Sequence, residues 1–262
     1  MITPVENFLS SYKRGKQAFL TGYFVGGDPN EETALSYIKE AVESGIDAIE
    51  VGIPSKNPYL EGDVIKRSHS RVYPDFKETK KIISFFQKLR SEIHVPILAM
   101  GYYEDVIQSG LYRELIKNQL IDGFVIPDLP LEKLKIIRQE LSKYNILLVP
   151  VINNGMEEEQ LTIALTGANL VYCQIYQGKT GSEIDNIEEL PSFYSRISSQ
   201  TDAVLMAGFG VKNAKFARQV WDCGFEGVVV GSEIVRLVEM QDRKKLSNFI
   251  HDLSKAKNRE GV

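Results

Sequence analysis

Two glutamates, Glu50 and Glu61, are the side chains in this sequence best suited to acid–base chemistry. Glu50 lies in the strand-like segment 48–53, where its neighbours Ile49 and Val51 take the opposite face. Burial disfavours a charged carboxylate, so it raises the proton affinity toward the value that a general acid–base needs. The other interpretation of Glu50 is a structural ion pair, but no strand offers an inward-facing cation. Glu61 follows on the next loop and either reaches the same site or is a solvated loop charge.

Three glycine-bearing segments follow later strand-like runs and could bind an anion. They contain Gly181, the pair Phe209 and Gly210, and the pair Gly231 and Ser232. Glycine lets the backbone approach an anion closely, and the N–H groups at a helix N-terminus point toward it with a favourable dipole. The alternative is that each glycine only ends a strand. Three such segments in neighbouring units favour a phosphate site.

Four other side chains lie where strands end and could line a binding site. Tyr23, Tyr102 and Tyr172 could form a flat aromatic slot, although tyrosines in strands often serve only as packing. Asp128 either accepts a hydrogen bond in the site or caps the helix that follows it. All four are candidate substrate-binding residues, with these alternatives left open.

The sequence predicts neither a metal nor a cofactor. We expect the three histidines, His69, His94 and His251, to lie at the periphery, and none has the spacing of metal ligands. No constellation of a nucleophilic serine, cysteine or lysine emerges. Acid–base chemistry by carboxylates therefore remains the leading expectation.

The segments that must position these residues alternate between strands and helices with great regularity. Such alternation predicts parallel βαβ units. Eight units in one chain predict an α/β fold, the (β/α)₈ TIM barrel. We expect a single domain over 1–262 with an extra N-terminal helix at 5–13. The candidate residues follow strands, and the strand–helix loops of a barrel share the rim that carries active sites. The strand-like runs are 18–25, 48–53, 95–100, 121–126, 146–152, 170–174, 203–206 and 227–230.

Composition narrows the possible partners of the protein. The 262 residues are 43% hydrophobic and 25% charged, and 31 Lys and Arg against 35 Asp and Glu give a net charge of −4. No basic patch points to nucleic acid, and no apolar run approaches the roughly 20 residues that span a bilayer. The N-terminal segment does not resemble a secretory signal, and the two cysteines lack CxxC spacing. We therefore expect a cytoplasmic protein whose partner is a phosphorylated small molecule, with no membrane or nucleic-acid partner.

The motifs in their order resemble the tryptophan synthase alpha chain family over nearly the whole chain. The resemblance implies a TIM barrel that cleaves indole-3-glycerol phosphate to indole and glyceraldehyde 3-phosphate without a cofactor. It also implies that Glu50 is the catalytic glutamate, that the three tyrosines line the site, and that the glycine segments bind phosphate. The motifs are Gly27-Asp28-Pro29, the segments 49–54, 125–130, 178–181 and 208–210, Pro58, Gly62 and Gly231-Ser232.

Departures from the family pattern leave two other functions open. Glu61 occupies the position of a catalytic aspartate that binds the indole N–H, so the acid is one methylene longer. The loop at 55–63 is rewritten, and Ile175 and Tyr176 replace a serine and, often, an arginine. These loops would contact a tryptophan synthase beta subunit, which is a possible partner. The alternatives are a diverged lyase or aldolase of a specialised pathway that acts on another phosphorylated substrate, and a non-catalytic subunit that regulates a beta-type partner.

Overall fold

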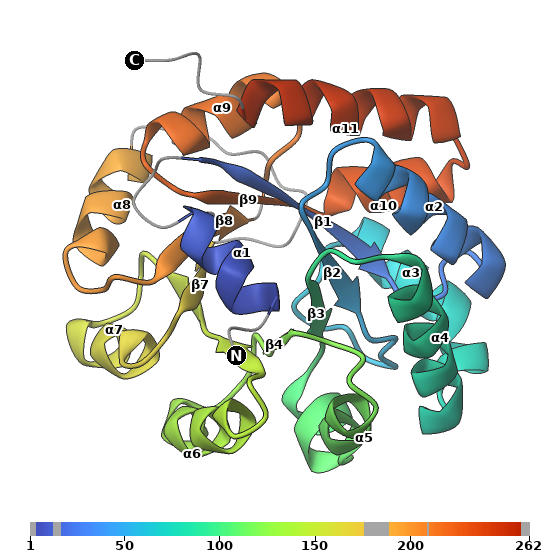
Figure 1. The fold of residues 1–262 in the computed structure, drawn as a ribbon, viewed down its shortest axis with the longest axis horizontal. Helices are drawn as coiled ribbons and strands as arrows, with labels where there is room; N and C mark the ends of the chain where they lie inside the picture. Colours follow the sequence, from blue (N-terminus) through green and yellow to red (C-terminus); the bar gives the residue numbers. More distant parts are fainter. Residues whose placement is uncertain (1–3, 13–16, 176–188, 209, 258–262) are drawn as a thin grey trace.

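A parallel β-sheet forms the centre of the molecule. The computed structural model describes residues 4–12, 17–175, 189–208 and 210–257. Within these residues, nine parallel strands pair in the order β5-β4-β3-β2-β1-β9-β8-β7-β6 (Figure 1). The strands are β1 Phe19–Val25, β2 Ala48–Gly52, β3 Ile97–Met100, β4 Gly123–Val125, β5 Leu147–Val149, β6 Val151–Asn153, β7 Leu170–Gln174, β8 Val204–Gly208 and β9 Gly227–Val230.

The sheet closes on itself through a single interrupted strand. β5 and β6 are separated only by Pro150, and β5 pairs with β4 while β6 pairs with β7. Proline has no backbone N–H, so it cannot donate to the ladder, but the Pro150 carbonyl accepts from the Tyr172 amide at 2.9 Å. The expected fifth strand, 146–152, is therefore two short strands. Joined across Pro150, the sheet forms the predicted barrel.

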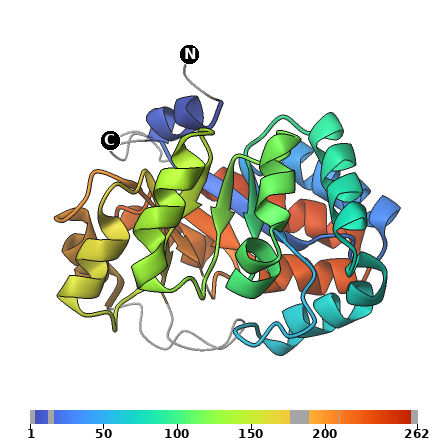
Figure 2. The same ribbon diagram turned by 90° about the horizontal axis from the view of Figure 1, so that it is seen from below.

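The helices other than α1 lie around the outside of this barrel (Figure 1). Figure 2 shows α1 at one end of the barrel and α3 toward the other. The helices of the described residues are α1 Pro4–Tyr12, α2 Glu31–Glu43, α3 Asp63–Phe76, α4 Thr79–Glu92, α5 Leu111–Lys117, α6 Leu131–Ser142, α7 Glu158–Leu165, α8 Leu190–Ser198, α9 Ala214–Asp222, α10 Ser232–Glu239 and α11 Arg243–Lys257, with a π-helical segment, η1, at Glu104–Gln108.

The extra N-terminal helix packs against the start of the first strand. The Phe8 and Tyr12 rings of α1 lie 5.2 and 5.0 Å from the Phe19 ring, measured between centroids. This aromatic contact places α1 at the amino-terminal end of β1. The opposite, carboxyl end of the strands is left for the loops that carry the candidate site residues.

Side-chain caps mark where two of these helices, α2 and α9, begin. Asn30 caps α2 by accepting from the Thr33 amide at 3.0 Å, and Asn213 caps α9 by accepting from the Phe216 amide at 2.8 Å. Each cap fixes the direction in which a helix leaves the loop before it.

Among the described residues, no helix combines the length and the apolar character needed to cross a membrane.

Candidate functional site

A cavity of about 220 Å³ opens where the central strands end. Its walls come from β1, β2, β3, β7 and β9 and from the segments that follow β2, β8 and β9. Glu50 and Glu61 line it from β2 and from the loop before α3 (the acid side), and Gly210, Gly231 and Ser232 line it from the segments that follow β8 and β9 (the glycine side). The barrel thus brings the predicted acids and three of the predicted anion-binding residues to one space.

Glu50 is a buried acid without a counter-ion among the described residues. It is 1% exposed and is the register partner of Tyr23 on the neighbouring strand. Neither carboxylate oxygen has a hydrogen-bond partner in the described part of the chain, and none of the ion pairs found there involves Glu50. Burial, with a smaller contribution from the charge of Glu61, raises the pKa of Glu50 to about 8. The carboxyl group is therefore largely protonated at neutral pH and can donate a proton into the cavity.

Glu61 lines the same cavity from the loop that leads into α3. Its exposed fraction is 5%, so the alternative of a solvated loop charge is wrong. Gly62, the next residue, is the N-cap of α3. Two acids facing one small space disfavour simultaneous ionisation, and Glu61 is the charge that adds to the effect of burial on Glu50.

The three tyrosines lie near one another but make different contacts. Tyr23 and Tyr172 line the cavity. Tyr102 instead accepts a hydrogen bond from the Leu60 amide at 3.2 Å and stacks on Tyr59 with 4.8 Å between ring centroids. Tyr102 therefore supports the loop that carries Glu61.

Two strand glycines make room for the cavity tyrosines. A Cβ atom on Gly52 would lie 2.3 Å from the Tyr23 hydroxyl, and one on Gly208 would lie 2.1 Å from the Tyr172 hydroxyl. Both distances are far below van der Waals contact. These glycines thus have a packing role in addition to ending β2 and β8.

Backbone groups dominate the other side of the cavity. Gly231 is the N-cap of α10 and Ser232 is its first residue, so this helix begins at the cavity wall, and the first amides of a helix have no intrahelical acceptor. Gly210 has φ +88°, a conformation that favours glycine. Arg236 also lines the cavity, and its Nε donates to Glu233 at 2.8 Å. Gly181 and Phe209 lie outside the described residues.

Asp128 lies at the rim and ties two segments together. It accepts from the Tyr59 hydroxyl and from the Tyr103 amide, both at 2.8 Å. The N-cap of α6 is Pro130, without a side-chain capping bond, so the alternative that Asp128 caps this helix is wrong. Asp128 is not among the residues that line the cavity, and its contacts fix the loop that carries Tyr59.

His69, expected at the periphery, is buried behind the cavity. It is 3% exposed, whereas His94 and His251 are exposed. Its ring nitrogens contact the Ser55 amide and the Tyr23 hydroxyl. The burial of His69 could have been predicted from helical spacing, because the buried residues of α3 recur with the period of a helix face that points inward. These residues are Ile65, Ser68, His69, Val72 and Phe76.

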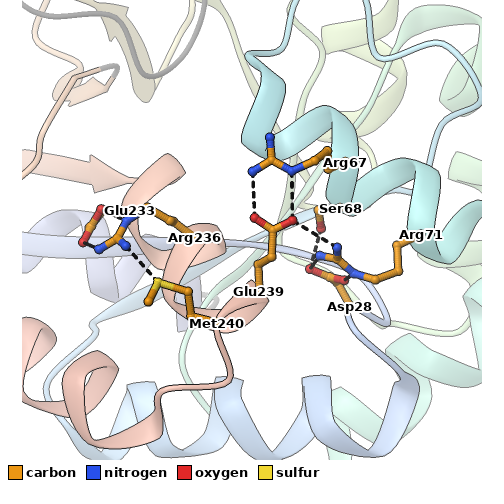
Figure 3. A network of polar contacts seen from close by, with 8 residues as sticks. All are labelled: Asp28, Arg67, Ser68, Arg71, Glu233, Arg236, Glu239 and Met240. Carbon is orange, nitrogen blue, oxygen red and sulfur yellow. Dashed lines mark hydrogen bonds and ion pairs between the residues drawn. The ribbon is translucent and has the colours of Figure 1, made fainter.

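A polar cluster fixes α3 and α10 beside the cavity (Figure 3). Asp28 accepts from Arg71 Nε at 2.6 Å and from Ser68 Oγ at 2.6 Å. Glu239, near the end of α10, accepts from Arg67 Nη2 at 2.7 Å and from Arg71 Nη1 at 3.2 Å. The cluster therefore connects the β1–α2 loop to the helix that follows Glu61 and to the helix that begins at the glycine side.

The protein resembles known proteins along nearly its full length. The sequence pattern described as "Tryptophan synthase alpha chain" matches residues 8–260. A tryptophan synthase alpha chain of Caldanaerobacter subterraneus is 32% identical over 228 residues, covering 86% of each chain, and one of Alkaliphilus metalliredigens is 29% identical over 265 residues, covering 98% of this chain and 99% of the other.

Solved structures agree with this assignment at the level of the fold. A tryptophan synthase structure of Mycobacterium tuberculosis superposes with a TM-score of 0.87 at 21% identity and covers 99% of this chain and 100% of the other. The alpha subunit of Legionella pneumophila gives 0.84 at 24% identity, covering 97% and 98%. The fold and the family expected from the sequence are confirmed. This chain belongs to the tryptophan synthase alpha chain family.

Proposed function

We propose that this protein is a carbon–carbon lyase of tryptophan biosynthesis that cleaves indole-3-glycerol phosphate to indole and glyceraldehyde 3-phosphate. One observation carries the proposal: Glu50, a buried acid without a hydrogen-bond partner among the described residues, shares a cavity with the amides that begin α10. The acid supplies proton transfer, and the helix start supplies a phosphate site. Membership of the family supports the choice of substrate.

Glu50 performs the proton transfers of a retro-aldol step. In its protonated form it donates to C3 of the indole ring, which leaves a positive charge at the ring nitrogen. The resulting carboxylate then takes the proton of the hydroxyl group on the carbon attached to the ring. The bond between this carbon and C3 breaks, its electron pair restores the indole ring, and the carbon becomes an aldehyde. One proton enters and one leaves, so Glu50 ends as it began.

Glu61 holds the indole ring during this step. Its carboxylate, buried in the same cavity, accepts the ring N–H and stabilises the positive charge that develops there. Tyr23 and Tyr172 line the space around the ring, while Tyr102 and Asp128 hold the surrounding loops. The longer side chain of Glu61 replaces the expected aspartate without loss of the charge.

Gly210, Gly231 and Ser232 bind the phosphate group through backbone amides and the Ser232 hydroxyl. The dipole at the start of α10 favours an anion there. Holding the phosphate fixes the distance between the reacting carbon and Glu50. The free energy of phosphate binding thus contributes to the rate, because it holds the substrate in the orientation that reacts.

A second candidate is a lyase that acts on a different phosphorylated carbon skeleton. Glu233, which lines the cavity beside the glycine side, favours it, because a third acid near the phosphate site changes the ligands that fit. Glu233 already accepts from Arg236, and a ligand with an amino group near its phosphate would bind this acid in addition. Indole-3-glycerol phosphate carries no amino group there.

A tryptophan synthase beta subunit is the proposed protein partner. The loop before α3 exposes two large apolar side chains, Tyr59 at 48% and Leu60 at 40%. Exposed apolar groups on a loop beside the active site are suited to a protein contact. A non-catalytic role in regulating this partner is the alternative, and it predicts that Glu50→Gln leaves the partner's response unchanged.

Indole release from indole-3-glycerol phosphate, measured with and without a beta subunit, tests the proposal. We expect release in the wild-type protein, and loss of release in Glu50→Gln with binding of the substrate retained. Absence of release under both conditions would overturn the proposed reaction. Tight binding of a phosphate ligand without release would favour the second candidate.

A further inference from the structure

His69 contacts different partners with its two ring nitrogens. The Ser55 backbone amide donates to Nδ1 at 3.0 Å, and the Tyr23 hydroxyl oxygen lies 3.3 Å from Nε2. All three groups are buried, and His69 lies in α3 while Tyr23 lies in β1. The imidazole thus joins the loop before α3 to a residue of the cavity wall.

The contact with Ser55 determines the tautomer of the ring. A backbone amide can only donate, so Nδ1 must present its lone pair and carries no proton. A neutral imidazole has one N–H, which therefore lies on Nε2. Burial lowers the pKa of His69 to about 4 and keeps the ring neutral. Nε2 is accordingly the donor in its contact with Tyr23.

The direction of the Tyr23 hydroxyl follows from this tautomer. The oxygen accepts from His69, so its own proton must point elsewhere. The backbone of β2 lies close on another side, because a Cβ atom on Gly52 would be only 2.3 Å from the hydroxyl oxygen. The remaining direction is the cavity, where Glu50 and Glu61 face Tyr23.

We propose that His69 is a positioning residue that fixes the Tyr23 hydroxyl as a hydrogen-bond donor into the cavity. This inference rests on the proposed function for its kinetic consequence. Both acids lie near the Tyr23 hydroxyl, Glu61 with the larger electrostatic effect and Glu50, on the adjacent strand, with the smaller. The hydroxyl makes no hydrogen bond to Glu50 in the structure, so the proposed donation begins only when Glu50 gives its proton to the ring and becomes a carboxylate. A hydrogen bond to a charged group is stronger than a neutral one and lowers the barrier to this step.

Two substitutions at residue 69 separate its two contacts. The Asn side chain in His69→Asn can accept from Ser55 in place of Nδ1 but does not reach Tyr23. The Gln side chain in His69→Gln reaches Tyr23 with an amide donor in place of Nε2 but does not present the Nδ1 acceptor. We expect kcat for indole release to fall about tenfold in His69→Asn. In His69→Gln it should stay within about twofold, which is about 0.4 kcal/mol, and KM should change little in both.

A double-mutant cycle with Tyr23→Phe tests whether His69 acts through the hydroxyl. In the Tyr23→Phe background, His69→Asn should cause no further loss of kcat, because the group that it positions is already absent. Multiplicative losses would overturn the proposal, as would equal losses in His69→Asn and His69→Gln. Thermal unfolding of each variant identifies losses that come from an unfolded fraction.

The tautomer can be measured without any substrate. The chain has only three histidines, so ¹⁵N imidazole signals of histidine-labelled protein are assigned by the signal missing in His69→Asn. We expect a neutral ring protonated at Nε2 at pH 7, with an Nε2 shift that changes in Tyr23→Phe. A ring protonated at Nδ1, a charged ring, or an Nε2 signal insensitive to Tyr23→Phe would overturn the proposal. The expected signals together with no indole release would instead count against the proposed reaction alone.

Discussion

The two sides of the cavity are built in different ways. On the acid side, β1, β2 and the loop before α3 present the buried side chains Tyr23, Glu50 and Glu61. On the glycine side, Gly231 and Ser232 present the backbone amides that begin α10. A side chain can be removed by one substitution, whereas a backbone amide remains after most substitutions. We therefore expect single changes to act strongly on kcat on the acid side and weakly on KM on the glycine side.

The largest expected effect is that of Glu50→Gln. The amide keeps the size of the side chain but neither donates nor takes the proton, so kcat for indole release should fall on the order of a thousandfold, with little change in KM. Glu226→Gln is a matched control, because Glu226 is also buried and accepts from the Leu205 amide at 2.9 Å at the start of β9. A Glu50→Gln enzyme within a few-fold of wild-type kcat would contradict the assignment of the acid side.

Glu50 should also make the stability of the protein depend on pH. Its pKa is raised from 4.5 to about 8 in the fold by burial and by Glu61, so ionisation opposes folding. Its contribution is favourable below the unfolded pKa and is lost as pH rises through the folded pKa. We expect Glu50→Gln to gain stability relative to wild type between pH 4.5 and 8, on the order of a few kcal/mol. Urea unfolding at several pH values measures the difference, and a pH-independent difference would contradict the raised pKa.

Alanine at the two strand glycines tests the packing of both cavity tyrosines in one experiment. Gly52→Ala presses on the Tyr23 hydroxyl and Gly208→Ala on the Tyr172 hydroxyl, at 2.3 and 2.1 Å. Overpacking of this kind costs about 1–3 kcal/mol of unfolding free energy. Tyr23→Phe should recover part of the loss in Gly52→Ala but none in Gly208→Ala, because it removes only the first clashing oxygen. Equal recovery in both backgrounds would contradict the specific contact.

Glu61→Gln tests whether the charge of Glu61 affects the ionisation of Glu50. Removing this charge lowers the pKa of Glu50, because Glu61 is one of the causes that raise it. Protonated Glu50 begins the reaction, so kcat/KM declines as pH rises through this pKa, and the decline should move to lower pH in the variant. The maximal kcat should fall about tenfold through the weaker partner for the ring nitrogen. A pH profile that does not move would show that the acids are not coupled.

The acid side shows which features of the site can be predicted from the sequence and which cannot. Strand alternation alone places Glu50 inside the barrel, because the period of two admits only two faces. Helical spacing indicates that His69 is buried, but its role depends on Ser55 and Tyr23, which lie 14 and 46 residues away. Such a contact has no local signature.

Packing between residues far apart in the sequence accounts for the other differences between the structure and the sequence-based predictions. Asp128 binds the hydroxyl of Tyr59, 69 residues away, and so holds a loop although its position also suits a helix cap. Tyr102 likewise stacks on Tyr59, and with Tyr23 and Glu61 it lines a small hollow at the site. The break of the fifth strand at Pro150 was accessible from the sequence, because proline lacks the donor that a strand interior requires.

The smallest expected effect is on the glycine side, in Ser232→Ala. The substitution removes one hydroxyl, while the amides at the start of α10 and their dipole remain. KM for the phosphorylated substrate should therefore rise only a few-fold, roughly 1 kcal/mol or less, with kcat unchanged. Competition by inorganic phosphate should weaken by the same factor, because the lost contact is to the phosphate group alone. A loss of kcat comparable to that of Glu50→Gln would mean that Ser232 belongs to the proton-transfer machinery, and the division of the cavity into two functionally distinct sides would then be wrong.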